Sequence, residues 1–237
     1  MNLKNLNIFD NCKWLIASAL LACAIVSGCS KSSCHKNIKE GSIKYKITYL
    51  SSEKENPIIG LLPSNITMKF KDDNVLLELE GWLGIFKSSF IKDNDQNAYT
   101  LLKILNKKFL YISTAGEGFY GMEKPDNMQI EFDDITKDII GFNCKHAIVT
   151  IPDICEFDVF YTTDIKIKNA TANTPLNKIP GMLMEFRLNM NGIPMTVEAT
   201  EYYDEKVPDT AFDIPEGYER VKRCQMDSIF NMIGQRK

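Results

Sequence analysis

The sequence predicts a mainly β domain built from a curved antiparallel sheet, with few helices and one helix near the C-terminus. From residue 42 onward, short segments alternate apolar and polar side chains with the period of two that is typical of half-buried strands. Polar turn sequences separate these segments at roughly even intervals. Many short strands at even spacing are typical of a barrel, a sandwich or a strongly curved sheet.

The first half of the domain contains six predicted strands. They cover residues 43–49, 66–71, 75–80, 85–91, 98–105 and 108–113. Polar turn sequences at 71–74, 93–97 and 106–108 lie between several of them. Residues 114–134 lack a regular pattern, so we expect an irregular connection there.

The second half contains four further predicted strands and the helix. The strands cover residues 139–151, 155–162, 183–189 and 195–203. Asn191-Gly192 between the last two is a strong hairpin signal. Residues 225–233 place apolar side chains at 226, 229, 230 and 233, which predicts a helix with one apolar face.

The N-terminal 28 residues have the layout of an export signal. Lys4 and Lys13 precede the apolar run from Trp14 to Val26. This run is shorter than the roughly 20 apolar residues of a membrane-spanning helix. The following residues, Val26-Ser27-Gly28-Cys29, resemble the lipobox of bacterial lipoproteins. This resemblance implies a signal peptide at 1–28, acylation of Cys29, a tether at 29–41 and a single β-rich domain at 42–237. Cleavage after a small residue to give a soluble secreted protein is the alternative.

The residue after the lipidated cysteine bears on the destination of a lipoprotein. An Asp at that position favours retention in the inner membrane, so Ser30 implies an outer-membrane lipoprotein that faces the periplasm. The formal charge of the chain is −3, which gives no basic excess for binding nucleic acid. The lipobox implies the membrane as a partner, through the N-terminal lipid, and nucleic acid is not an expected partner.

Four cysteines follow the lipidation site. They are Cys34, Cys144, Cys155 and Cys224. An even number in an oxidising compartment suggests two disulfides, and three pairings are possible. We favour Cys34 with Cys224, and expect Cys144 and Cys155 to lie close together in a neighbouring pair of strands. The sequence contains no C-x-x-C pair and only two histidines, so we expect no metal site and no cofactor.

Three short motifs lie between residues 137 and 186. They read Lys-Asp-Ile-Ile-Gly-Phe-Asn-Cys-Lys-His-Ala from Lys137, Tyr-Thr-Thr-Asp-Ile from Tyr161, and Ile-Pro-Gly from Ile179. They are similar to the K-x-I-x-G-Y-x-C-x-x-A strand, the Tyr-Thr element and the [LI]-P-G loop of the GLPGLI-type envelope proteins and related uncharacterised lipoproteins. Phe142 stands where that family usually has Tyr. The resemblance implies a half-barrel like that of the LolA/LolB/LppX group, with helices over a concave apolar face.

The same resemblance implies a non-enzymatic protein that binds a hydrophobic ligand or acyl chain. Because methionines adapt to irregular apolar shapes, the expected rim of the pocket is the loop and strand that contain Ile179, Pro180, Gly181, Met182, Met184 and Phe186. The alternative is an envelope scaffold or accessory lipoprotein with a filled core, which binds another protein. A pocket of several hundred Å³ would favour the first function.

The sequence offers little support for catalysis. It has no G-x-S-x-G elbow, no H-E-x-x-H helix and no complete dinucleotide-binding fingerprint. We interpret His146 as a core or surface residue and not as a general base. The sequence therefore predicts a protein that is not an enzyme.

Overall fold

The computed structural model describes residues 37–52, 54, 56–81, 84–122 and 124–234. The described residues belong to one compact unit. The strands are β1 (Glu40–Tyr49), β2 (Asn65–Lys71), β3 (Asn74–Glu80), β4 (Phe86–Lys92), β5 (Ala98–Ile104), β6 (Lys107–Ile112), β7 (Gln129–Ile139), β8 (Phe142–Ile151), β9 (Cys155–Thr162), β10 (Met182–Met190), β11 (Ile193–Tyr203) and β12 (Glu219–Arg220). The helical elements are the 3-10 turns η2 (Pro57–Leu61) and η4 (Asp209–Phe212) and the helix α2 (Arg223–Gly234).

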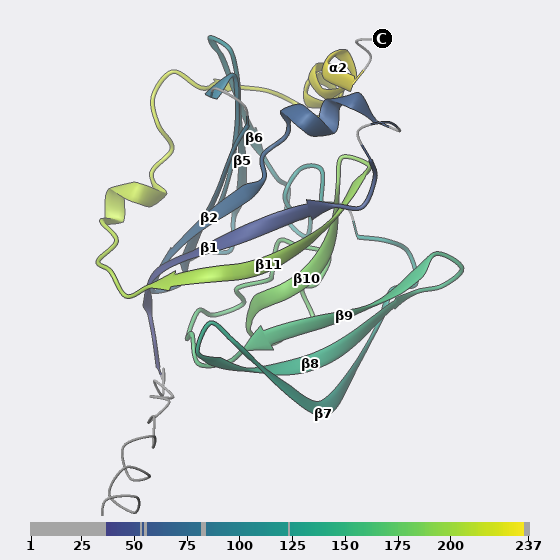
Figure 1. Ribbon diagram of the computed structural model, residues 1–237. Coiled ribbons are helices and arrows are strands. Elements are labelled where there is room, and N and C mark those ends of the chain that lie inside the picture. Colours follow the sequence, from purple (N-terminus) through teal and green to yellow (C-terminus); the bar gives the residue numbers. More distant parts are fainter. Residues whose placement is uncertain (1–36, 53, 55, 82–83, 123, 235–237) are drawn as a thin grey trace, which may run out of the picture. The chain divides into compact units, whose positions relative to one another are not determined.

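All twelve strands form one open, curved sheet, with the order β12-β6-β5-β4-β3-β2-β1-β11-β10-β9-β8-β7 (Figure 1). The chain runs outward from β1 to β6 as a meander. It then crosses to the opposite edge at β7 and returns inward to β11, which pairs with β1. Every pair is antiparallel except the short pair of β12 with β6. The predicted fold class, a mainly β curved antiparallel sheet with one C-terminal helix, is confirmed.

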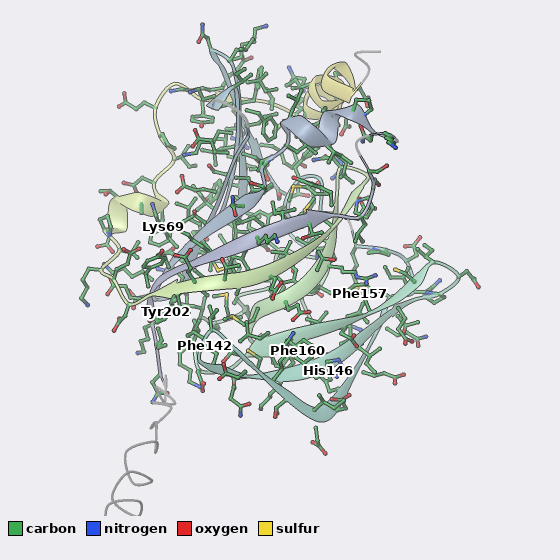
Figure 2. The ribbon with its side chains drawn as sticks, viewed as in Figure 1. Lys69, Phe142, His146, Phe157, Phe160 and Tyr202 are labelled. Atoms are coloured by element: carbon green, nitrogen blue, oxygen red, sulfur yellow. The ribbon has the colours of Figure 1, made fainter. Side chains whose placement is uncertain are left out.

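The main core lies on one face of this sheet. Alternate side chains of β1 and β2, among them Tyr45 and Phe70, are buried together with those of β8 to β11. Figure 2 shows Phe142 and Tyr202 near one another, and their rings meet edge to face with centroids 5.1 Å apart. At about 25 cal/mol per Å² of buried apolar surface, this continuous core is the main stabilising contribution to the fold.

Two long connections, and not helices, add their own side chains to this core. Residues 113–128 contribute Phe119 and Met122, and residues 163–181 contribute Leu176 and Ile179. The connections join where the amide of Phe119 donates to the carbonyl of Asn173 at 2.8 Å. The resemblance to the LolA group implied helices over the concave face; within the described residues these connections cover the main core, and α2 covers the same face only at its outer part, beside Leu102 and Tyr111.

The helix α2 packs against the outer part of the sheet at β6. Met226 is fully buried beside Tyr111 and Tyr120. The Tyr120 ring stacks on Phe230 with centroids 5.3 Å apart, and the Tyr120 hydroxyl donates to Asp227 at 2.7 Å. The predicted helix at 225–233 is therefore present, with each end extended by one or two residues.

One predicted strand boundary is wrong, and the irregular connection expected at 114–134 ends earlier, because β7 begins at Gln129. The segment 139–151 is not one strand, because β7 ends at Ile139 and β8 begins at Phe142. Ile140 and Gly141 both have positive φ, of 49° and 86°, and form the turn between them. β1 begins at Glu40, within the last two residues of the predicted tether, and Ile38 pairs with Ile165.

Candidate functional site

The residues predicted to form a pocket rim lie mostly inside the core. Ile179, Met182 and Phe186 are buried, and Met184 is completely buried. Pro180 is exposed, and Gly181 is half-buried. The loop and the strand β10 are adjacent, as their sequence requires, but their apolar side chains meet other side chains instead of an open space.

A small cavity remains beneath this strand. Its volume is about 40 Å³, and its lining includes Tyr45, Met68, Phe119, Met182 and Phe186. Ligand pockets are usually about 300–1,000 Å³, so the cavity has no room for an acyl chain. It is large enough for a few water molecules. The interior is therefore essentially filled by the protein's own side chains.

Among the described residues that line this cavity, Lys92 is the one that carries a charge. It lies at the end of β4 and is 1% exposed. Its ammonium group donates to the backbone carbonyl of Asp73 at 2.6 Å. Burial lowers the pKa of Lys92, although the nearby carboxylates of Asp73 and Asp93 oppose this effect. A buried ammonium beside an apolar cavity is the feature of this interior that most resembles a binding group for an anion.

Gly181 is needed for the packing of the predicted rim. A Cβ atom added at this position would lie 2.5 Å from the carbonyl oxygen of Thr162. The close approach lets β10 begin directly beside the end of β9, where Met182 pairs with Thr162. The Ile-Pro-Gly motif therefore has a structural role in joining the connection 163–181 to β10.

A second cluster of polar residues surrounds His146, which the sequence gave no reason to select. His146 is 4% exposed, and it lies on β8, between the edge strand β7 and β9. Its Nδ1 lies 2.8 Å from Asp133 Oδ2 on β7, and its Nε2 lies 3.0 Å from Asp158 Oδ1 on β9. Figure 2 shows the ring beside Phe160, with centroids 4.8 Å apart.

The electrostatics of this cluster favour a doubly protonated ring. Burial lowers the pKa of His146, but the hydrogen bonds to Asp133 and Asp158 raise it by more, so its pKa lies above the usual value of 6.5. The hydrogen bond from His146 lowers the pKa of Asp133. An imidazolium whose two nitrogens both donate to carboxylates has no free nitrogen to act as a base. The cluster joins three strands, and while the ring is doubly protonated neither nitrogen can accept a proton.

The β8–β9 register could have revealed part of this cluster. The turn at residues 152–154 pairs Ile151 with Cys155, which places His146 opposite Phe160 and Ile148 opposite Asp158. Asp158 is thus a diagonal neighbour of His146 on the same face. Asp133 could not have been found in this way, because β7 carries an irregularity between Phe132 and Thr136.

The three described cysteines are free thiols. Cys144 and Cys155 lie on adjacent strands, but Cys155 pairs with Ile151, seven positions along β8 from Cys144. At about 3.3 Å per residue they are about 23 Å apart, whereas the Cα atoms of a disulfide lie within about 7 Å. The expectation that Cys144 and Cys155 lie close together is wrong. Cys34 lies outside the described residues, so its pairing with Cys224 stays a prediction.

The lipidation site and its signal also lie outside the described residues. These are Cys29 and residues 1–28. Among the residues that the structure describes, no helix has the length and apolar character needed to cross a membrane. Over the same residues, no three His, Cys, Asp or Glu side chains are grouped as metal ligands would be.

Comparison with known proteins identifies the fold and leaves the family open. No protein-family model matches the chain, and no curated protein matches its sequence. The solved structure of PNGF-II is similar, with a TM-score of 0.51 at 17% sequence identity. The match covers 81% of this chain but only 33% of PNGF-II, so the chain spans about a third of that protein's length. At this level of identity the similarity concerns the arrangement of strands alone.

Proposed function

We propose that this chain is a non-enzymatic, lipid-anchored protein of the cell envelope that acts through its surface, as a scaffold or accessory protein. Acylation of Cys29 would hold it at the outer membrane, facing the periplasm. The filled interior is the observation that favours a scaffold over a carrier of a hydrophobic ligand. Met184 and its neighbours are packed core, and the cavity beside them is about 40 Å³.

The anchor is tested by changing Cys29. Cys29→Ser should block attachment of a fatty acid and removal of the signal by the lipoprotein route. Metabolic labelling with a clickable fatty acid measures this directly. Undiminished labelling of the Cys29→Ser protein would contradict the anchor.

The filled interior is tested by native mass spectrometry and by overpacking. The purified mature protein should have the mass of the chain and its anchor, with no co-purified lipid. Met184→Trp adds volume to a completely buried position, and should lower the free energy of unfolding by about 1–3 kcal/mol. Asn189→Trp places the same side chain at an exposed position of β10 and is the matched control. Stoichiometric lipid in the wild-type protein would reject the proposal.

A carrier of a hydrophobic anion is the second candidate, and Lys92 is the observation that favours it. Opening of the connections 113–128 and 163–181 would enlarge the cavity and leave the Lys92 ammonium facing a bound carboxylate. In that case Lys92→Met should abolish binding of a fluorescent fatty acid. If the protein acts through its surface, the wild-type protein already fails to bind this probe.

A further inference from the structure

The hairpin of β5 and β6 carries a concentration of positive charge. Residues 98–112 contain three lysines and no Asp or Glu, although the whole chain has a formal charge of −3. Lys103 on β5 pairs directly with Lys108 on β6 and with Lys87 on β4. Like charges that face each other across strands are unfavourable, so this row of lysines works against the stability of the sheet.

Neighbouring acids balance only part of the row. Lys87 forms an ion pair with Glu78 at 2.7 Å. Lys108 lies over the Tyr218 ring at 5.5 Å. Lys103, between these two lysines, and Lys107, at the start of β6, add further positive charge at the same end of the strands.

The tip of this hairpin presents apolar side chains to solvent. Leu105, in the turn, is 63% exposed, and Ile85, before β4, is 41% exposed. The two residues are neighbours, because the amide of Leu105 donates to the carbonyl of Ile85 at 2.8 Å. Leu105 has a φ of 53°, a conformation that Asn or Gly adopts more easily than Leu. Neither burial nor local backbone preference therefore accounts for a leucine at this position.

We propose that this tip, defined as Leu105, Ile85 and the lysines 103, 107 and 108, docks on an anionic lipid surface. Lysines near such a surface are attracted by its negative potential, and an exposed aliphatic side chain can enter the boundary between headgroups and acyl chains. The combination of apolar tip and flanking positive charge fits a lipid surface better than nucleic acid, since the described residues of the tip include no exposed aromatic side chain for base stacking.

The topology places this tip away from the point where the chain enters the sheet. Glu40, at the start of β1, pairs with Lys71 at the end of β2. The meander then puts the start of β4 and the β5–β6 turn at the other end of the strands (Figure 1). A chain held by its N-terminal segment can therefore offer the tip to a second surface.

Capture of vesicles tests this proposal with the full chain. The protein is reconstituted into neutral phosphatidylcholine vesicles, and labelled vesicles that contain phosphatidylglycerol are added. We expect the wild-type protein to capture the anionic vesicles and not neutral ones, and 0.5 M salt, on the order of a 4 Å Debye length, to abolish capture. Flotation of the first vesicles shows separately whether the protein is held on them.

Variants assign the effect to the tip. The triple variant Lys103→Gln, Lys107→Gln, Lys108→Gln should reduce capture at least tenfold, and Leu105→Asn should reduce it severalfold. The matched control changes the exposed lysines Lys124, Lys145 and Lys178 to Gln, with the same loss of charge and no loss of capture. Arginines at 103, 107 and 108 should preserve capture. A melting temperature no lower than that of the wild-type protein shows that each variant is folded.

Three results would overturn the proposal. They are no capture by the wild-type protein, capture that survives the triple change at the tip, and an equal loss in the control triple variant. Clustering of the protein-bearing vesicles with one another, without anionic lipid, would show that a second copy of the chain occupies the tip instead.

Discussion

The β5–β6 and β7–β8 hairpins place aliphatic residues at the same unfavourable turn position, with different consequences. Leu105 has a φ of 53° and Ile140 a φ of 49°. Left-handed backbone costs such residues about 1–2 kcal/mol. Ile140 packs against the main core, so burial offsets its strain. Leu105 is exposed, so no comparable burial offsets its backbone strain. This difference favours a role for Leu105 in contact with a partner.

The charges around the two hairpins differ as well. β7 is an edge strand that carries Glu131, Asp133, Asp134 and Asp138, and it is interrupted by an irregularity. Charges and bulges protect an exposed edge from pairing with another chain. His146 fastens this edge to the two strands behind it. We therefore expect changes near β7 to affect stability, and changes at the tip to affect binding.

Of the changes that compare the two hairpins, substitution of His146 should lower the free energy of unfolding most. His146→Ala removes the buried ring and both of its hydrogen bonds to carboxylates. One such bond contributes about 1.5–3 kcal/mol, and the bond to the exposed Asp158 contributes less. Chemical denaturation should show a loss of about 2–3 kcal/mol in the free energy of unfolding. Lys145→Ala, at the exposed neighbouring position, should change it by less than about 0.5 kcal/mol. Equal effects of the two changes would refute the role of His146.

The same cluster predicts a pH dependence. Because the folded pKa of His146 is raised above 6.5, its contribution to stability is complete below about pH 6.5 and is lost as the pH rises through the folded pKa. The folded pKa of Asp133 is lowered, so its contribution is lost only in acid, below about pH 3.8. Urea denaturation from pH 5 to pH 9 should therefore show the stability advantage of wild type over His146→Gln shrinking at the alkaline end.

Substituting Asn at each of the two turns compares them directly. Asn tolerates left-handed backbone, so both Leu105→Asn and Ile140→Asn relieve strain. Only Ile140→Asn also loses contacts with the core, and its free energy of unfolding should fall below that of Leu105→Asn by about 1–2 kcal/mol. Thermal unfolding of the two single variants measures this difference. If Ile140→Asn is the more stable variant, burial of the Ile140 side chain does not offset its backbone strain.

Sequence alone predicted the elements that have one polar and one apolar face. The strand at 43–49, the strand at 155–162 and the Asn191-Gly192 hairpin were all predicted, because alternating burial and turn chemistry are local properties. β7 was missed because it is an edge strand in which eight consecutive residues, 131–138, are exposed, so no alternation of buried and exposed positions marks it.

The candidate sites could be predicted only in part, because they depend on contacts between distant residues. The Ile-Pro-Gly loop was placed correctly before β10, but whether Met184 lines a cavity depends on Phe119, Leu176 and other side chains of the two long connections. The His146 cluster requires an Asp from each flanking strand. The lysine row at the tip depends on the register of three strands.

The smallest expected effect concerns Cys144, whose reactivity reports on the β7 edge. Cys144 is completely buried and pairs with Lys137 of β7. Burial raises its pKa to about 12, and a protonated, inaccessible thiol does not react.

The exposed Cys155 should be alkylated at once in the native protein, and Cys144 only when β7 opens. Mass spectrometry after timed alkylation should show Cys144 reacting faster in His146→Ala, with the rate in Leu105→Asn unchanged. Equal alkylation rates of Cys144 in the two variants would mean that His146 does not hold β7 against β8. The acidic β7 edge and the basic tip would then no longer differ in how they respond to substitution.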